Sequence, residues 1–406
     1  MKRFVIIGNG VAANSAAEAV RKLDQAASIV MFSRESHGFI YTPALPELLS
    51  GEKAAEKLII HDPQWYARRE IDLRLDCPVH DIDADRRVLI TAQGREEPYD
   101  MLLLATGGQA FVPPFPGADL PGVCTLRTMA DAQRIRAMAG SRRRLVLIGG
   151  GLLGLEAGNG LRRAGAQVEV VEVFPRLLPR QTDPQAAKQL QGLLEAMGFA
   201  FHLDRKTLEI RETTDGLEVA LDNGNRLAAD MVLISAGVRP ELTFAHRLGL
   251  EVGKAVQVDD RMQTSHEEVY AAGDVCEHRG RYYGIWPAAM EQGRVAGVNM
   301  GGGTAAYTGT IPSNSLKVAG IALTAFGEID AEEKHPAMVH QELENGIYRK
   351  VVLDEDGLIL GGVFLGDEPG SRVALATLNR DRRPDNQLLD LFPGGLIVPS
   401  TGGGQG

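Results

Sequence analysis

The clearest pattern of apolar and polar positions in the chain occurs twice. An apolar run at 4–7 is followed by a glycine-rich turn, an alanine-rich segment and a second apolar run at 28–33. The blocks 3–13 (RFVIIGNGVAA) and 144–154 (RLVLIGGGLLG) align at a constant offset of 141 residues, and a second apolar run follows the later block at 167–172. Short apolar runs bounded by turns are typical of buried parallel strands. Each copy therefore predicts a strand, a turn, a helix and a strand.

The glycines of both turns have the G-x-G-x-x-G/A spacing of dinucleotide-binding sites. The first glycine makes the sharp turn, the second lets the backbone approach a pyrophosphate, and the third small residue lets the helix pack against the strand. These positions are Gly8, Gly10 and Ala13 in the first copy, and Gly149, Gly151 and Gly154 in the second. The phosphates would lie at the positive helix N-terminus. Two such motifs predict two dinucleotides, of which a flavin and a nicotinamide are the obvious pair.

The ends of the second strands predict how each ribose is held. Glu172 ends the strand of the second copy, where a carboxylate would accept both hydroxyls of an adenosine ribose. No arginine follows it directly, so a 2′-phosphate would meet an unpaired negative charge, and NADH should be preferred over NADPH. In the first copy Ser33 occupies this place, with Glu35 close behind. Either residue is a candidate for the FAD ribose.

Composition narrows the class of protein. The 43 Lys and Arg against 53 Asp and Glu give a net charge of −10, which disfavours nucleic acid and anionic membranes as partners. Cys77, Cys124 and Cys276 have no C-x-x-C or metal-ligand spacing, so we expect no disulfide scaffold, zinc module or iron–sulfur cluster, and a reducing cytoplasm fits best. No uncharged apolar segment reaches the ~20 residues of a spanning helix. We expect a soluble cytoplasmic protein without bound metal.

Three further motifs complete a recognisable set: LLLATGG at 102–108, VLISAGVRPE at 232–241 and VYAAGDV at 269–275. With the two glycine turns they resemble the pyridine-nucleotide disulfide oxidoreductase superfamily over about residues 1–330. The resemblance implies an enzyme that binds FAD and NADH. It implies FAD contacts for Ala105, Thr106, Gly107, Gly273 and Asp274, and NADH contacts for Ala236 and Gly237.

The subfamily is indicated by a missing cysteine. Disulfide reductases and NADH peroxidases of this superfamily place a redox cysteine close after the first strand–helix–strand unit, but here that stretch, residues 38–51, reads GFIYTPALPELLSG. Cys276 lies two residues beyond Asp274 but has no partner thiol. Thiol or disulfide chemistry is therefore not expected.

The same loop resembles the Y-x-R-P-P-L-S-K segment of oxygenase-type ferredoxin reductases. It retains Pro43, has Thr42 in place of the arginine and has Glu47 in place of the lysine. In that family the lysine pairs with the glutamate that corresponds to Glu156. The resemblance implies that Glu156 orients the nicotinamide carboxamide, whereas spacing alone is equally compatible with an acid that stabilises a helix start.

Loss of that lysine is shared with NADH:rubredoxin oxidoreductases and the flavin part of NADH-dependent nitrite reductases. Residues 311–329 (IPSNSLKVAGIALTAFGEI) also resemble those proteins, and we hypothesise that Lys317 supplies the missing positive charge near the flavin. Trp286 begins WPAAMEQGR, which resembles a ferredoxin-reductase segment whose helix N-terminus points at the flavin pyrimidine. A core aromatic is the alternative for Trp286.

The leading prediction is an FAD-dependent reductase that passes electrons from NADH to a small iron-containing carrier of rubredoxin or ferredoxin type. A second is the flavin subunit of a nitrite-reductase-like assembly, and a third is a non-enzymatic redox sensor that binds NADH and flavin. Arginine clusters at 68–69, 142–144 and 380–383 are either docking sites for an acidic carrier or solvated faces. Nothing in the sequence sets the oligomeric state.

The predicted fold class is α/β, with two Rossmann-like domains and a smaller α+β domain. The FAD domain would comprise 1–113 and 242–308, with the NADH domain (114–241) inserted between its halves. A C-terminal α+β domain would occupy 309–406. Its last residues, 400–406, should be disordered.

Overall fold

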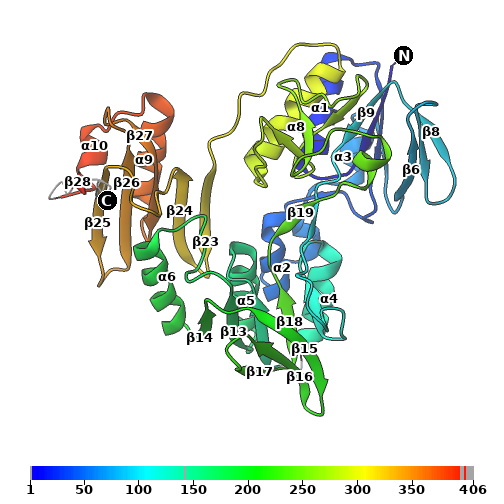
Figure 1. Cartoon of the computed structure of the whole chain (residues 1–406). Coiled ribbons are helices and arrows are strands. Elements are labelled where there is room, and N and C mark those ends of the chain that lie inside the picture. The colour runs from blue at the N-terminus through cyan, green and yellow to red at the C-terminus, as the bar shows by residue number, and fades with distance from the viewer. Residues whose placement is uncertain (1, 141–142, 394–396, 399–406) are drawn as a thin grey trace, which may run out of the picture. The chain divides into compact units, whose positions relative to one another are not determined.

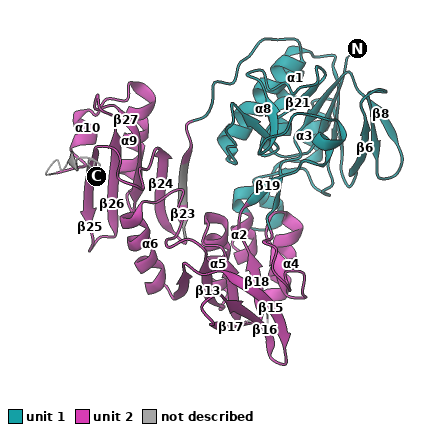
Figure 2. Cartoon of the chain, in the orientation of Figure 1, with its two compact units in different colours: residues 1–44, 53–111, 238–310 teal, residues 45–52, 112–237, 311–406 magenta. Residues whose placement is uncertain are grey.

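The computed structural model describes residues 2–140, 143–393 and 397–398, and many of its elements are labelled in Figure 1. The predicted disordered tail lies outside these residues. The chain divides into two compact units (Figure 2). The first comprises Met1–Ala44, Lys53–Phe111 and Val238–Thr310, and the second comprises Leu45–Glu52, Val112–Gly237 and Ile311–Gly406. The predicted boundaries between the FAD, NADH and C-terminal domains stay a prediction.

The first unit is built on a five-stranded sheet in which every neighbouring pair is parallel. Its strands, in spatial order, are β21 (Val269–Ala271), β9 (Met101–Leu104), β1 (Arg3–Ile7), β2 (Ser28–Phe32) and β5 (Ile71–Arg74). All residues of β1 and β2 after the first are buried. The predicted parallel strands of the first copy are thereby confirmed.

Two long helices of this unit, α1 (Val11–Leu23) and α8 (Trp286–Met300), pack through small residues and lie side by side in Figure 1. A Cβ on Gly293 would collide with the backbone of Ala12, and one on Gly297 with the backbone of Ala16. The two helices therefore approach as closely as their backbones allow, which fixes the start of α8 relative to the first glycine turn.

Shorter elements complete the first unit. They are β3 (Phe39–Ile40), η1 (Thr42–Ala44), η2 (Ala55–Leu58), β4 (Ile59–His61), α3 (Pro63–Ala67), β6 (Val79–Asp83), β7 (Val88–Thr91), β8 (Glu96–Pro98), β10 (Gly108–Ala110), β19 (Val238–Pro240), α7 (Thr243–Arg247), β20 (Val256–Val258) and β22 (Cys276–His278).

The second unit repeats the same parallel sheet with the second glycine turn. Its strands, in spatial order, are β11 (Val123–Thr125), β18 (Met231–Ile234), β12 (Arg144–Ile148), β13 (Gln167–Glu172) and β14 (Phe199–Leu203). Its helices are α2 (Leu45–Ser50), α4 (Met129–Ala139), α5 (Leu152–Arg163) and α6 (Pro184–Ala196). An antiparallel sheet of β15 (Thr207–Thr213), β16 (Gly216–Leu221) and β17 (Arg226–Ala229) adjoins it.

The C-terminal part of the second unit is an antiparallel sheet with helices, as predicted. In spatial order its strands are β23 (Ser313–Val318), β24 (Ile321–Gly327), β27 (Ile359–Leu365), β26 (Ile347–Leu353), β25 (Ala337–Glu342) and β28 (Ile397–Val398). Helix α9 (Glu368–Arg380) packs on β24 and β27, and α10 (Asn386–Leu389) follows it. Phe326, Val351 and Phe364 lie in the core beneath them. The predicted α/β class with two Rossmann-like sheets and a smaller α+β part is confirmed.

A buried polar cluster joins this antiparallel sheet to α6 within the second unit. Asp183, the N-cap of α6, accepts a hydrogen bond from the Tyr348 hydroxyl at 2.5 Å and lies 3.4 Å from the Lys350 ammonium. Lys350 is only 4% exposed and also donates to the Asp330 carbonyl at 2.8 Å. Burial, and then the charge of Asp183, raise the pKa of Tyr348. Because each polar group has a partner, the cluster fixes where the sheet attaches.

Across the described residues, the helices are all too short or too polar to cross a lipid bilayer.

Candidate functional site

The first glycine turn is closed by backbone contact with the A-T-G turn. Gly8 has φ +122°, and a Cβ there would collide with the carbonyl of Ala105. Gly107 has φ +69°, so both turns use backbone conformations that favour glycine. Ala13 is fully buried where α1 packs. The structure therefore brings together Gly8 and the predicted FAD residues Ala105, Thr106 and Gly107.

The N-terminus of α1 carries no side-chain cap. Gly10 is its N-cap, no acid lies in the first turn, and a Cβ on Gly10 would have open space around it. By contrast, side chains cap α3, α4, α6, α9 and α10, namely Asp62, Thr128, Asp183, Asp367 and Asp385. Free N–H groups at a helix start suit a phosphate.

Side chains that we did not predict fix this turn from beneath. Asn14, 2% exposed, donates to the carbonyls of Asn9 and Gly10 at 3.1 and 3.0 Å. The Tyr66 hydroxyl lies 2.9 Å from Asn9 Oδ1 and 2.6 Å from Asn14 Oδ1. His61 Nδ1 lies 3.2 Å from the same Asn14 oxygen. The one sequence signal for this network is a polar asparagine among the buried alanines of α1.

A cavity of about 350 Å³ opens beside the turn. Gly8 and Thr106 line it, and Thr106 Oγ1 donates to the Glu241 carbonyl at 3.4 Å. The other lining residues are Ile7, Phe32, Arg34, Pro78, Val79, His80, Glu241, Thr243, Phe244 and Arg247. Arg247 already donates to Asp81 at 2.8 Å. The mixture of apolar and polar residues that line this cavity suits the adenosine end of a dinucleotide.

Ser33 and Glu35 form one turn at the end of β2. Ser33 is buried, and its hydroxyl accepts the backbone N–H of Glu35 at 3.1 Å. The Glu35 carboxylate lies 3.9 Å from His37 Nε2. Both candidates for the FAD ribose therefore stay open.

The G-D turn is held by α8. Gly273 has φ +86° and donates its N–H to Gln292 Oε1 at 3.0 Å, so Gln292, which is 1% exposed, fixes the turn that carries Asp274. The Cys276 thiol lies 3.5 Å from the same oxygen. Burial raises the pKa of this thiol well above its usual range, and the negative charge of Asp274 raises it further. A neutral buried thiol is a poor nucleophile.

Trp286 lies at the uncapped start of α8. Its ring stacks on Phe39 with centroids 5.6 Å apart and meets Tyr41 edge-on at 5.0 Å. Pro43 is exposed in the neighbouring turn η1. The core and cofactor interpretations of Trp286 are thus compatible, since the ring is half-buried and has aromatic neighbours.

The second glycine turn repeats the closure of the first. Gly149 has φ +107°, and a Cβ there would collide with the Ser235 carbonyl, directly before the predicted NADH residues Ala236 and Gly237. A Cβ on Gly154 would lie 2.9 Å from the Gly149 carbonyl oxygen. Helix α5 also begins without a side-chain cap, at Gly151.

Glu172 is held rigidly beside this turn. It is 6% exposed, and its two oxygens accept the N–H groups of Gly150 at 2.7 Å and Phe174 at 2.9 Å. Each carboxylate oxygen keeps a further lone pair for a ribose hydroxyl. The predicted ribose acid therefore lies at the glycine turn that it should serve.

Glu156 lies half-buried on α5, and its Oε1 accepts the backbone N–H of Ala319 at 2.9 Å. Burial, and then the charges of Glu47 and Glu52, raise its pKa, while the Ala319 hydrogen bond acts in the opposite direction. Lys317, on the strand that leads to Ala319, is exposed.

These features fit the two predicted groups. In each Rossmann-like sheet, the first strand is followed by a glycine turn in which a Cβ would collide with the neighbouring backbone, and the next helix begins without a side-chain cap. The second sheet also has the buried carboxylate of Glu172, which could accept from a ribose. FAD would lie on the first unit's turn and NADH on the second's.

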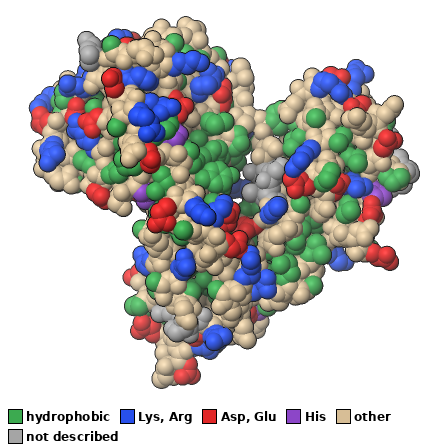
Figure 3. All heavy atoms as spheres, turned by 180° about the vertical axis from the view of Figure 1, so that it is seen from behind, with side chains coloured by type: hydrophobic (Ala, Val, Ile, Leu, Met, Phe, Trp, Pro, Cys, Tyr) green, Lys and Arg blue, Asp and Glu red, His purple; other side chains and the backbone are tan. Residues whose placement is uncertain are grey.

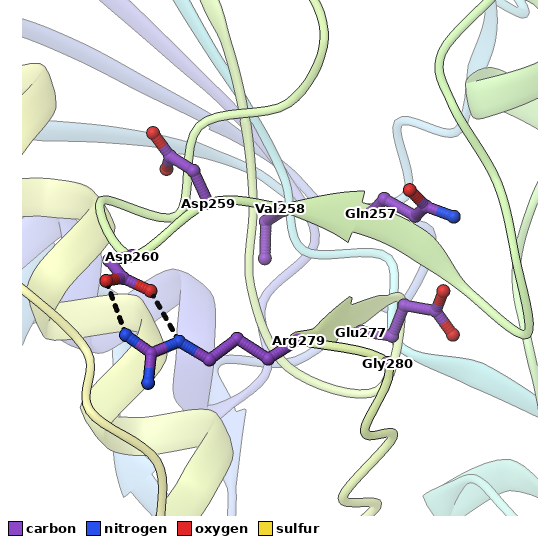
Figure 4. Close-up of a pocket in the computed structure, with 7 residues that line it drawn as sticks. All are labelled: Gln257, Val258, Asp259, Asp260, Glu277, Arg279 and Gly280. Carbon is purple, nitrogen blue, oxygen red and sulfur yellow. Dashed lines mark hydrogen bonds and ion pairs between the residues drawn. The ribbon is translucent and has the colours of Figure 1, made fainter.

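Other features lie apart from these turns. A second cavity, of about 530 Å³, contains none of the predicted site residues, and Arg279 there pairs with both Asp260 oxygens at 2.9 and 2.6 Å (Figure 4). Among the described residues, no group of three His, Cys, Asp or Glu could hold a metal ion.

The arginine clusters are only partly available for docking. Arg144 pairs with Asp230 at 2.6 Å and Arg380 with Asp385 at 2.9 Å, whereas Arg142 lies outside the described residues. The face in Figure 3 shows basic and acidic side chains interspersed.

Comparison with known proteins agrees with this geometry. Residues 2–293 match the pyridine nucleotide-disulphide oxidoreductase family, and residues 312–375 match the rubredoxin NAD+ reductase C-terminal domain. A nitrite reductase [NAD(P)H] of Bacillus subtilis is 35% identical over 92% of this chain but only 46% of its own length. The chain spans about half the length of several such relatives.

Other relatives match over most of their length. A rubredoxin-NAD(+) reductase of Ectopseudomonas oleovorans is 32% identical over 84% of this chain and 90% of its own. The crystal structure of NADH:rubredoxin oxidoreductase from Clostridium acetobutylicum has a TM-score of 0.76 at 25% identity and covers 98% of this chain and 96% of its own. The family match over residues 2–293 and the relatives of similar length agree with the two glycine turns of the structure. The chain belongs to the pyridine nucleotide-disulphide oxidoreductase family.

Proposed function

We propose that this protein is an NADH-dependent flavoprotein reductase that passes electrons through FAD to a small iron-containing carrier of rubredoxin or ferredoxin type. FAD and NADH are the characteristic cofactors of its family. One arrangement, which occurs twice, carries the proposal. In each copy a glycine turn packs against a neighbouring backbone carbonyl, that of Ala105 or that of Ser235, and the helix after the turn begins without a side-chain cap. One chain thereby offers two dinucleotide sites.

The protein's contribution would be binding and orientation. When bound, the flavin supplies the chemistry that converts a two-electron hydride donor into a source of single electrons. Gly10 and Asp274 would hold the phosphate and ribityl parts, and the start of α8 at Trp286 would place a positive helix end near the flavin ring. Glu172 would hold the NADH ribose, and Glu156 its carboxamide edge. Lys317 would supply positive charge at the flavin.

The cysteines support an acceptor other than a thiol or disulfide. None of the three forms a disulfide in the described structure, and two of them, Cys124 and Cys276, are buried. The segment 38–51 contains no cysteine. Electrons would therefore leave to another molecule, and the match of residues 312–375 to a rubredoxin reductase C-terminal domain supports an iron protein as that partner.

A second candidate is the flavin part of a nitrite-reductase-like assembly. It is favoured by one observation, the 35% identity to a nitrite reductase of which this chain spans 46%. The metal centre that reduces nitrite would then lie outside these 406 residues.

Anaerobic stopped-flow spectroscopy tests both candidates. NADH should bleach the flavin absorbance, NADPH should do so much more weakly, and added rubredoxin should restore the colour far faster than oxygen does. Fast reoxidation only in the presence of a nitrite-reducing metalloprotein would favour the second candidate. If NADH leaves the flavin absorbance unchanged, both enzyme functions fail, and a long-lived reduced complex that ignores every carrier would favour the redox sensor.

We also propose that the chain has three domains. The segments 1–113 and 242–308 would form the FAD-binding domain, 114–241 would form the NADH-binding domain, and 309–406 would form the C-terminal α+β domain.

A further inference from the structure

The carboxylate of Glu156 receives its hydrogen bond from a distant part of the chain. Its partner, the Ala319 N–H, lies 163 residues further on, in the turn between β23 and β24. Strand β23 also packs on α5, the helix that carries Glu156. The contact therefore joins the antiparallel C-terminal sheet to the helix that follows the second glycine turn.

The turn that presents this N–H is sharply defined. Val318 and Ile321 are paired across the hairpin, so Ala319 and Gly320 form a two-residue loop, with φ +51° and +91°. Positive φ at both central residues is what a type I′ turn requires. Alanine is uncommon in this conformation, and Ala319 is 5% exposed. A strained, buried residue persists where the surrounding structure holds it in place.

The surroundings of Glu156 explain why such a donor matters. Glu47, which stands where oxygenase-type ferredoxin reductases have the lysine that pairs with this glutamate, adds a like charge, and so does Glu52. Arg163, on the same helix as Glu156, is paired with Glu52, and Lys317 on β23 is exposed. The hydrogen bond that the structure gives the Glu156 carboxylate comes from the backbone of the hairpin.

We infer that the Ala319–Gly320 turn is a positioning element for Glu156 and takes the place of the absent lysine. This inference rests on the proposed function, because it assumes that Glu156 orients the nicotinamide carboxamide. A fixed carboxylate oxygen limits the side chain to few rotamers, so less conformational entropy is lost when NADH binds. The second oxygen would accept a hydrogen bond from the ligand.

The attachment of the sheet supports this role. The Asp183–Tyr348–Lys350 cluster fixes the same antiparallel sheet to α6, at a second place in the unit. Two separate contacts then hold the C-terminal sheet against the helices α5 and α6. The C-terminal sheet would thus contribute to the nicotinamide site through Glu156.

A matched pair of glycine substitutions tests the inference. Gly320→Val places a β-branched residue at φ +91° with open space around its Cβ, so it should displace the turn without a steric clash. Gly357→Val does the same at φ +76°, in the turn between β26 and β27, again with open space. Both variants should retain FAD. Gly320→Val should weaken NADH binding about tenfold, while Gly357→Val should leave it unchanged.

Two further measurements separate positioning from general damage. In Gly320→Val, the added substitution Glu47→Lys should recover most of the NADH affinity, because it supplies a cation beside Glu156. In the wild-type holoenzyme, the Ala319 amide should exchange slowly with deuterium, and Glu156→Ala should make it exchange at least tenfold faster.

The outcomes separate this inference from the proposed function. If Gly320→Val binds NADH as tightly as Gly357→Val, or if Glu47→Lys recovers nothing, the positioning role is overturned even though the wild-type flavin is still reduced by NADH. Unchanged exchange of the Ala319 amide in Glu156→Ala also overturns it. If the wild-type flavin is not reduced at all, the proposed function fails, while the exchange experiment still reports on the contact.

Discussion

Two glycines of the first turn, only two residues apart, should respond differently to alanine, one through folding stability and the other through FAD affinity. Gly8 has φ +122°, and its Cβ would overlap the Ala105 carbonyl. The conformation alone costs about 1–3 kcal/mol, and displacing the backbone adds to it. We therefore expect Gly8→Ala to lower the free energy of unfolding of the apoprotein by roughly 3 kcal/mol or more.

Gly10 has an ordinary φ of −82° and open space around its Cβ. As a helix N-cap, alanine is less stabilising than glycine by several tenths of a kcal/mol. Alanine also reduces the conformational entropy of the unfolded chain, which stabilises the folded state by ~0.4–1 kcal/mol. These effects nearly cancel, so Gly10→Ala should leave the stability of the apoprotein within about 0.5 kcal/mol of the wild type. The new methyl group would stand where a pyrophosphate must approach, and FAD affinity should fall at least tenfold, which is about 1.4 kcal/mol.

The assay is urea unfolding of the deflavinated protein, followed by titration of each variant with FAD through quenching of flavin fluorescence. Gly149→Ala and Gly151→Ala form the equivalent pair for NADH, since a Cβ on Gly149 would collide with the Ser235 carbonyl, whereas a Cβ on Gly151 would lie 4.0 Å from the same oxygen. The reasoning is refuted if Gly10→Ala binds FAD like the wild type, or if Gly8→Ala is as stable as Gly10→Ala.

Three more predictions follow from contacts described above. Glu172→Gln should weaken NADH binding about tenfold and NADPH binding less, as measured by titration, because it removes the charge that favours a free ribose hydroxyl; equal losses for both would contradict this role. Arg144 holds the pKa of Asp230 at about 2, below its ordinary 3.8, so the ionised carboxylate stabilises the fold above about pH 4 and this contribution is lost as the pH falls towards 2. Asp230→Asn should therefore cost about 1 kcal/mol at neutral pH, allowing for solvent screening, and little at the acid end, which urea unfolding across that range would show. Iodoacetamide should modify the half-buried Cys77 in the native protein and leave Cys124 and Cys276 intact until the protein unfolds; rapid native labelling of Cys276, seen by peptide mass spectrometry, would contradict its burial.

The parts of the fold that depend on local pattern were predictable. The two apolar runs of each copy, and the glycines between them, predict β1, β2, β12 and β13, because burial on both faces and turn geometry leave a direct record in the sequence. The position of Glu172 at the end of β13 follows from the same pattern, and the structure places its carboxylate against Gly150.

Contacts between distant side chains were not predictable. Tyr66 reaches Asn14 across 52 positions, and Glu156 meets Ala319 across 163. Neither pair has a spacing rule, since their meeting depends on how whole elements pack. The buried Lys350 was missed for a related reason: a lysine in a strand suggests an exposed face, and only its partners Asp183 and Asp330 make burial possible.

The strand order of the first sheet has a consequence for how the protein is made. Its edge strand β21 and covering helix α8 are synthesised last, with Met300 following Leu104 of β9 by 196 residues. At ribosomal rates of about 5–20 residues per second, this interval lasts roughly 10–40 s. The second parallel sheet, from β11 to β18, emerges completely within it. On the ribosome, the second parallel sheet should therefore fold before the first is complete. Until α8 has been translated, the strands β1, β2 and β9 lack the helix that covers them.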